Sequence, residues 1–393
     1  DYLSGMLSMR NDGASLPELI GKYLGRNAKM VMLAFTVLLL IMVGTVFVYS
    51  PAEILHSIWG SSLFWIIVIF AYYVIATMLP IDKIIGKIYP LFAFSLLFMA
   101  GALMVMLFVK MPQLPELWTH FYNMGAEAEP EKWTDQIFPC LFITIACGAI
   151  SGFHATQSPL MARCVKSEHM GRPIFYGAMI TEGVVALIWA TVSSWFFYGS
   201  PAPGYELIAA VNTGFSTSAP AVVNIVCNDW LGVAGAILAL LGVVAAPITS
   251  GDTAFRSARL IIGEWLHIDQ RPIIKRLAIC LPLFISSIAM LVWQIENPDG
   301  FNIIWQYFGW ANQTLSVFTL WTLTVYLVRQ KKPYIITLIP ALLMTTVCTT
   351  FLFVSKQAFH LPENIGYLLG ILCLVVALVW FIVWYRKEKS KLV

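Results

Sequence analysis

Long apolar runs separated by short polar segments dominate the chain. Ten of these runs approach the roughly 20 residues that an α-helix needs to cross ~30 Å of hydrocarbon. The pattern predicts transmembrane helices at 30–49, 63–79, 90–109, 137–162, 174–198, 230–248, 277–293, 301–328, 334–354 and 365–385. We therefore expect an all-α polytopic membrane protein with a transmembrane bundle over 30–385, because lipid-exposed backbone must satisfy its own hydrogen bonds.

The residues before the bundle predict a helix of a different kind. Ser15 and Glu18 have the spacing of a capping box, which satisfies backbone N–H groups at a helix start. Apolar residues follow on one helix face: Leu19, Ile20, Tyr23 and Leu24. The segment 1–29 is therefore predicted to be cytoplasmic and to place a short amphipathic helix on the inner membrane face.

Basic residues test the number of spans and orient them. Lys and Arg are retained preferentially on the cytoplasmic side of membrane proteins. If ten spans alternate from an N-terminal segment inside, 21 of the 24 basic residues lie inside, and only Lys110, Lys132 and Lys356 lie outside. A missing or an extra span would move every later loop to the opposite side of the membrane, and the basic residues would no longer gather on one side. We therefore expect both ends of the chain, including a basic tail at 386–393, to be cytoplasmic.

The composition agrees with a lipid environment. Charged residues make up 11% of the chain and apolar residues 59%, whereas soluble domains carry roughly 25% charged residues. The net charge of +3, without a basic stripe, gives no reason to expect nucleic acid as a partner. The longest loop, 110–136, is too short for a separate catalytic or sensing domain.

Cysteine and histidine give no sign of a metal centre. The seven cysteines form no C-x-x-C pair, and the six histidines are scattered. We expect neither a disulfide framework nor a zinc site, and no cofactor. The sequence also lacks the G-x-x-x-x-G-K-[ST] loop that binds ATP. Uphill transport would therefore draw on an ion gradient.

The fourth span carries the densest polar signal within the membrane. Its second half combines helix-breaking and polar residues: Gly148, Ser151, Gly152, His154, Thr156, Gln157, Ser158 and Pro159. Since proline removes a backbone donor and clashes one turn back, we expect a broken helix. Transporters use such breaks to bind substrates and ions. The alternative is a kinked helix in which His154 and Gln157 hydrogen-bond to a neighbour.

Glu182 lies about eight residues into the fifth span, roughly 12 Å deep at 1.5 Å per residue. No basic residue shares that span. A carboxylate in hydrocarbon must find a partner or a proton. We interpret Glu182 as a candidate proton-coupling group. The alternative is a structural carboxylate bound to a partner such as His154 or a hydroxyl.

A polar stretch that includes Thr213 and Ser216 precedes the sixth span. It is too polar for a lipid-facing helix, although apolar sequence flanks it. The stretch fits a re-entrant gate segment near the substrate pathway. The alternative is an ordinary external loop.

The sixth span is predicted to end beside Thr249, Ser250 and Asp252. Hydroxyl and carbonyl oxygens near a helix end can coordinate a cation, so Thr249 and Ser250 are candidate sodium ligands. The alternative is a capped helix, in which Asp252 forms a surface salt bridge with Arg256 four residues further on.

The eighth span contains the adjacent amides Asn312 and Gln313 beside Gly309 and Trp310. Two interpretations stay open. The amides line a polar cavity, or they form interhelical hydrogen bonds that hold the bundle together, each worth about 0.6 kcal/mol.

These stretches resemble the carbon starvation protein A (CstA) family of bacterial inner-membrane transporters. The matching segments are DYLSGMLSMRNDGASLPELIGKYLG at 1–25, SGFHATQSPLMARC at 151–164, NTGFSTSAP at 212–220, PITSGDTAFRSAR at 247–259 and FGWANQTL at 308–315. The resemblance spans nearly the whole chain, and its motifs are long and specific.

The resemblance implies a secondary transporter for peptides, or in some branches pyruvate, that responds to carbon starvation. It also implies inverted five-helix repeats, and further hydrophobic helices ahead of the first motif that this chain lacks. We therefore expect an importer in the bacterial inner membrane, driven by a proton or sodium gradient. Two rival classes stay open: a channel, and an intramembrane enzyme that uses His154 with Ser151 or Ser158.

Overall fold

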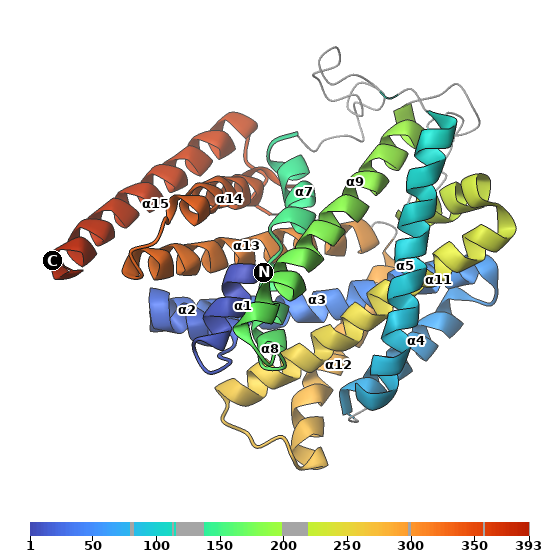
Figure 1. Ribbon diagram of the computed structural model, residues 1–393, viewed down its shortest axis with the longest axis horizontal. Coiled ribbons are helices and arrows are strands. Elements are labelled where there is room, and N and C mark those ends of the chain that lie inside the picture. The colour runs from blue at the N-terminus through green and yellow to red at the C-terminus, as the bar shows by residue number, and fades with distance from the viewer. Residues whose placement is uncertain are drawn as a thin grey trace. The chain divides into compact units, whose positions relative to one another are not determined.

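The computed structural model of the chain describes residues 1–78, 82–111, 114, 137–198, 219–297, 300–356 and 358–392. Within these ranges the regular structure is helical, and no strand occurs (Figure 1). The principal helices are α1 (Tyr2–Met9), α2 (Leu16–Leu24), α3 (Arg26–Ile58), α4 (Ser62–Met78), α5 (Asp82–Lys110), α7 (Phe142–Ala149), α8 (Gly152–Ala162), α9 (Gly177–Tyr198), α11 (Ala219–Trp265), α12 (Ile273–Glu296), α13 (Gly300–Arg329), α14 (Ile335–Val354) and α15 (Glu363–Leu392). Short helical turns complete the set: η1 (Ile137–Leu141), η2 (Glu168–Met170) and η3 (Arg172–Tyr176).

Eight helices in the described ranges are long and apolar enough to cross a membrane. Each of the ten predicted spans coincides with a helical segment, but two of them fall outside the eight. The apolar helix α4 has only 17 residues. Polar residues such as Asn312 and Gln313 lower the hydropathy of α13. The chain is thus an all-α polytopic membrane protein, as predicted.

The helices form two compact units. The first contains 1–40, 123–181 and 294–393, and the second contains 41–122 and 182–293. Three of the four boundaries fall inside α3, α9 and α12, and the fourth lies outside the described residues. Each unit is described by itself below.

In the first unit, α2 is the predicted amphipathic helix, but it packs on protein. Ser15 occupies the N-cap without a side-chain capping bond in the described structure, and Glu18 pairs with Lys29 instead of closing a capping box. Leu19 is buried with Leu323 of α13. The apolar stripe of α2 therefore packs against α13, and its predicted place on the inner membrane face stays a prediction.

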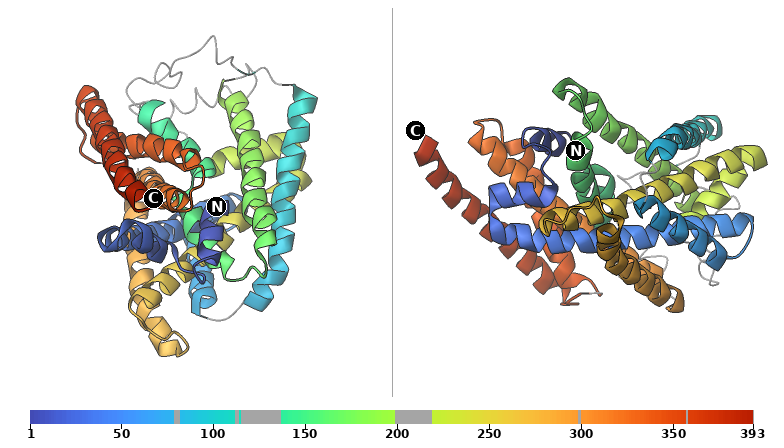
Figure 2. Two further views of the ribbon diagram at one scale, coloured as in Figure 1. Left: turned by 60° about the vertical axis from the view of Figure 1, so that its left-hand side comes forward. Right: turned by 90° about the horizontal axis from the view of Figure 1, so that it is seen from below.

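The C-terminal helices of the first unit lie side by side. In Figures 1 and 2, α14 runs beside both α13 and α15. The Thr324 hydroxyl of α13 donates to the Thr337 hydroxyl of α14 at 2.9 Å in a buried contact. The α15 helix continues to Leu392, so the predicted basic tail extends this last helix.

In the second unit, α11 packs against α5 and α4. It is kinked at Gly232, whose φ of 65° and ψ of −179° suit a residue without Cβ. Beyond Pro247 the helix continues to Trp265, past the predicted end of the sixth span. A proline removes only its own backbone donor, so the residues that follow can keep helical bonding.

Candidate functional site

The fourth predicted span is broken, as expected from its polar residues. Helix α7 ends at Ala149, Ile150 leaves the helical region with φ −141° and ψ 71°, and α8 begins at Gly152. Ser151 is extended, and its hydroxyl accepts a bond from the His154 N–H at 3.5 Å. Serine is a favoured N-cap because its side chain satisfies a free donor. The helix is therefore interrupted at Ile150, and Ser151 starts α8 as its N-cap.

Pro159 does not cause the break, although we expected it to. It lies inside α8 and is buried. Its carbonyl accepts a bond from the Ser8 hydroxyl of α1 at 3.1 Å. A proline near the first turns of a short helix disturbs few backbone bonds, so α8 tolerates it.

Helix α13 joins the two halves of the broken span through Asn312. The Asn312 side chain has no exposed surface. Its Oδ1 accepts bonds from the Phe153 N–H at 2.6 Å and from the Ser151 hydroxyl at 3.3 Å. Its Nδ2 lies 3.4 Å from the Sγ of Cys147 in α7. One buried amide thus contacts both α7 and α8 and satisfies a backbone donor that the break sets free.

Gln313 makes one further bond between helices and one bond within α13. Its Nε2 donates to the Ile143 carbonyl of α7 at 3.2 Å, and its Oε1 accepts from the Ser316 hydroxyl at 3.3 Å. Both amides are fully buried. Of the two interpretations of Asn312 and Gln313, these contacts agree with hydrogen bonds between helices.

Gly152 allows the close approach of α8 to α13. A Cβ at this position would overlap the Asn312 carbonyl oxygen, and it would lie 2.7 Å from the Leu315 Cβ and 3.0 Å from the Ser316 nitrogen. Two of these three atoms belong to the backbone of a helix, so they cannot rotate away. We call the junction of α7, α8 and α13 around Ser151, Gly152 and Asn312 the joint.

Asp1, the N-cap residue of α1, contacts two more of the residues predicted on the fourth span, and the other two bond within α8. The Asp1 carboxylate accepts a bond from the Ser158 hydroxyl at 2.9 Å and lies 3.8 Å from the Nδ1 of His154. The Thr156 hydroxyl donates to the Phe153 carbonyl at 2.6 Å, and the Gln157 amide donates to Thr156 at 3.2 Å.

An ion pair at the surface fastens α1 to the segment after α8. The Arg10 guanidinium forms two bonds of 3.2 Å to the Glu168 carboxylate and a third, also 3.2 Å, to the Tyr326 hydroxyl of α13. These bonds raise the pKa of Arg10, because the charged form donates them. The N-terminal segment is therefore an integral part of the first unit.

The remaining predicted residues lie elsewhere. Glu182 is half-buried on α9 and belongs to the second unit, as do Thr249, Ser250 and Asp252. Thr213 and Ser216 fall outside the described residues, so their role stays a prediction. The structure thus brings together the residues of the fourth and eighth spans within one unit.

Asp252 forms the expected pair with Arg256, but the carboxylate half of the pair is buried. The Asp252 side chain is 1% exposed, and its Oδ2 lies 3.3 Å from the Nη2 of Arg256. The same guanidinium also donates to the Ala76 carbonyl of α4 at 3.4 Å. The predicted surface salt bridge thus has a buried carboxylate and a partly exposed guanidinium, because α11 continues as a helix against α4 instead of ending.

The hydroxyls beside this pair bond within α11. Thr249 donates to the Ala246 carbonyl at 2.9 Å, and the Thr249 carbonyl accepts from Thr253 at 2.8 Å. Bonds of this kind, from a hydroxyl to a carbonyl three or four residues back, are local to the helix. A sodium site at Thr249 and Ser250 stays a prediction.

Tyr73 is a structural residue that the sequence analysis missed. Its ring has no exposed surface, and its hydroxyl donates to the Phe47 carbonyl at 2.7 Å and lies 3.3 Å from the Pro247 carbonyl. A Cβ at Gly251 would collide with the Tyr73 hydroxyl. A tyrosine within an apolar run carries no sign of such a partner, since tyrosines also anchor spans at the interface.

Arg256→Ala is expected to lower the stability of the protein by about 1.5–3 kcal/mol, because it removes a charged hydrogen-bond donor from the buried Asp252 carboxylate. The measurement is unfolding of the purified protein in detergent. The matched control is Arg271→Ala, since Arg271 is 93% exposed and lies 4.0 Å from Asp269, an arrangement that contributes little. Equal effects of the two substitutions would show that the buried pair has no special role.

Comparisons with known proteins point to one family. The sequence matches the family described as Carbon starvation protein CstA over residues 48–202 and 206–351. An uncharacterised membrane protein of Haemophilus influenzae is 41% identical over 257 residues, which cover 53% of this chain and 69% of that protein. The Peptide transporter CstA of Bacillus subtilis is 28% identical over 328 residues, which cover 74% of this chain and 54% of the relative.

A shorter match involves a second kind of transporter. The Pyruvate/proton symporter BtsT of Escherichia coli is 41% identical over 75 residues, which cover 19% of this chain and 10% of the symporter. The chain spans about half the length of the curated peptide transporters that it matches. The family match covers most of the chain and includes α7, α8 and the amides of α13. The chain therefore belongs to the carbon starvation protein CstA family of membrane transporters.

Proposed function

We propose that this protein is a secondary active transporter that imports peptides or pyruvate across the bacterial cytoplasmic membrane under carbon starvation. A proton or sodium gradient supplies the energy. The observation that carries this proposal is the broken span α7–α8, joined through a buried amide of α13 in a chain of the CstA family. Broken helices inside a membrane are typical of secondary transporters, which bind substrate at such interruptions.

The joint is suited to alternating access because it connects two short helices through side chains. The bonds of Ser151 and Asn312 hold α8 in place, while the extended Ser151 separates it from α7. Both proposed substrates carry a carboxylate, which the positive end of a helix attracts. In this conformation the Phe153 and His154 N–H groups bond to protein oxygens. The proposal therefore requires these bonds to open when substrate enters.

The hydrogen bonds of Ser151 and Ser158 give less support to an intramembrane enzyme than to a transporter. The Ser151 hydroxyl donates to Asn312, and the Ser158 hydroxyl donates to Asp1. A serine nucleophile would instead donate to the imidazole that activates it. The named relatives are also transporters, and their names favour carrier over enzyme.

Uptake into proteoliposomes that contain the purified protein tests the proposal. Labelled alanyl-alanine and labelled pyruvate are each offered under an imposed pH gradient, an imposed sodium gradient and no gradient. A carrier concentrates one substrate above its external level only with its gradient, and excess unlabelled substrate inhibits that uptake. Equilibration without concentration under every gradient would indicate a channel, and chemical conversion of the substrate would indicate an enzyme.

The orientation is a separate proposal, and it gives a second test. With both ends cytoplasmic, Lys166 lies inside and Lys356 lies outside, and both side chains are exposed. In a variant without native cysteines, we expect Lys356→Cys to react with an impermeant maleimide added to intact cells. Lys166→Cys should react only after the membrane is opened. Labelling of Lys166→Cys in intact cells would overturn the topology.

A further inference from the structure

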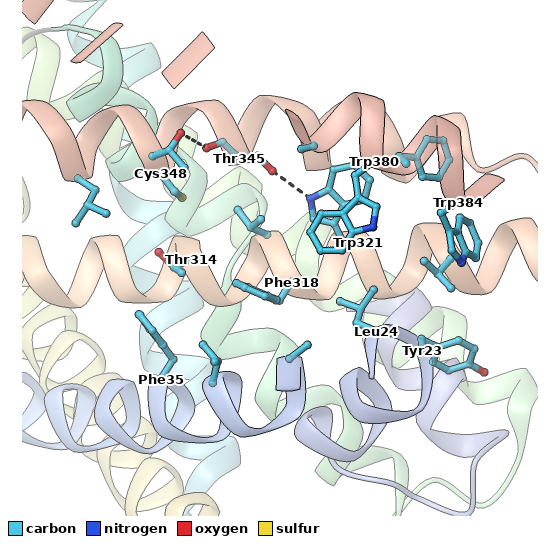
Figure 3. Close-up of a pocket in the computed structure, with 18 of the residues that line it drawn as sticks. Tyr23, Leu24, Phe35, Thr314, Phe318, Trp321, Thr345, Cys348, Trp380 and Trp384 are labelled. Carbon is cyan, nitrogen blue, oxygen red and sulfur yellow. Dashed lines mark hydrogen bonds between the residues drawn. The ribbon is translucent and has the colours of Figure 1, made fainter. Parts of the chain in front are cut away.

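A long groove lies within the first unit, between the α2–α3 segment and helices α13, α14 and α15 (Figure 3). Its volume is about 670 Å³, which is within the range of roughly 300–1,000 Å³ for small-molecule sites. Tyr23 and Trp384 lie at one end of the groove, and Phe35 and Cys348 lie at the other. Trp380 lines the groove and is 74% exposed, so the groove opens to the surroundings.

The walls of the groove are mainly apolar. Its lining threonine hydroxyls bond to carbonyls of their own helices: Thr314 to Trp310 at 2.9 Å, Thr345 to Ala341 at 2.6 Å and Thr349 to Thr345 at 2.8 Å. The indole N–H of Trp310 donates to the Cys348 carbonyl at 3.1 Å, and that of Trp321 donates to Thr345 at 3.1 Å. These hydroxyl and indole groups therefore already have hydrogen-bond partners within the protein, and the wall of the groove suits an apolar chain.

The end of the groove at Tyr23 is different, because cations gather there. The Lys22 ammonium lies 6.0 Å from the centre of the Tyr23 ring, and the Arg329 guanidinium lies 5.9 Å from it. Both side chains are exposed. Glu388 pairs with Arg329 at 2.9 Å, whereas Lys22 donates to the neutral amide of Asn11. The rim thus carries an excess of positive charge beside an aromatic ring.

This combination matches one class of membrane component. Lipid tails are as apolar as the groove, so the groove alone gives no preference for one lipid over another. Selectivity has to come from the rim, where lysine and arginine bind phosphate and where tyrosine and tryptophan favour the headgroup level. Basic pockets between transmembrane helices are known to bind anionic headgroups.

We propose that this groove binds an anionic phospholipid, with one acyl chain between α3 and α15 and its phosphate at Lys22 and Arg329. The bound lipid joins α15 to the N-terminal segment, which also packs on α8. Lipid binding in this groove goes beyond the proposed transport function and does not rest on it. Removal of the lipid is expected to destabilise the first unit, because a ligand that binds only the folded state stabilises it by mass action.

The test is thermal unfolding of the purified protein in dodecyl maltoside, with palmitoyl-oleoyl phosphatidylglycerol or with phosphatidylcholine of the same chains. We expect phosphatidylglycerol to raise the unfolding temperature by several degrees more than phosphatidylcholine does. The double variant Lys22→Gln/Arg329→Gln should lose this difference. Thr349→Phe should also lose the difference between the two lipids, because the phenylalanine ring fills part of the groove. The difference between the two lipids is the readout, so a lower starting stability of a variant does not obscure it.

The matched control removes two exposed charges from the second unit through Arg271→Gln/Lys275→Gln, and it should keep the full difference. Equal effects of the two lipids on the unsubstituted protein would overturn the proposal. So would a difference that survives Lys22→Gln/Arg329→Gln. A difference that is lost in that double variant but kept in Thr349→Phe would overturn the groove as the site of the acyl chain.

Discussion

Gly152→Ala is expected to reduce transport to the level of empty vesicles. The added methyl group would overlap the Asn312 carbonyl oxygen and press on the Leu315 Cβ. Relief requires α8 to move away from α13, which breaks the bond between the Phe153 N–H and Asn312 at the joint. Overpacking of this kind costs about 1–3 kcal/mol. We expect the protein to remain folded, with a lower unfolding temperature, while the joint loses its geometry.

Gly177→Ala is the matched control, because it adds the same methyl group to a helix of the same unit. Nothing lies within 4 Å of a Cβ at Gly177, and alanine favours a helix over glycine by up to about 1 kcal/mol. This variant should transport normally and unfold no earlier than the unsubstituted protein. Normal transport by a folded Gly152→Ala protein would show that the approach of α8 to α13 is not needed. Failure of both variants would point to a general intolerance of added methyl groups.

Glu182→Gln is expected to abolish concentrative uptake driven by a pH gradient. The substitution keeps the shape of the side chain and removes its ability to take up and release a proton. A carboxylate inside a span, exposed to each side in turn, can carry a proton together with the substrate. Exchange of labelled for unlabelled substrate should continue, since exchange needs no net proton movement. The measurement compares the two modes in the same proteoliposomes.

Glu363→Gln is the control for loss of a carboxylate, because Glu363 is exposed at the start of α15. It should concentrate substrate as well as the unsubstituted protein. If Glu182→Gln also concentrates substrate at the full rate, Glu182 is a structural residue. Asp252, or a sodium site near Thr249 and Ser250, is then the next candidate for coupling. Loss of both uptake and exchange would likewise argue against a role in coupling alone.

The break in the fourth span was predictable in place but not in cause. Glycines, hydroxyls and a proline gather within a dozen residues, and glycine and proline are the least favourable residues in a helix interior. We expected the proline to break the helix because its effect is the largest. In the structure, Ser151 ends the interruption as an N-cap and Pro159 lies inside α8. The local sequence indicates where the helix is least stable. The residue that caps the next helix depends on the helices that pack against this region.

Asp252 illustrates a similar limit. Its spacing to Arg256 was enough to predict an ion pair, because residues four apart share a helix face. Its burial was not predictable, since it depends on α4 and on the continuation of α11 past Pro247. An exposed ion pair and a buried one have the same sequence pattern, but their contributions to the free energy of unfolding are very different.

The order of apolar runs by itself determined that this protein is an all-α membrane bundle, because backbone groups in hydrocarbon must bond within their own segment. It also identified the amphipathic helix and the region of the break. Only the tertiary structure decided what each of them touches. Ser151 and Asn312 are 161 positions apart, and Ser8 and Pro159 are 151 apart. Periodicity reports the face that a residue occupies on its own helix, but the partner on that face is chosen when distant helices pack, by shape and hydrogen bonding that no single segment contains.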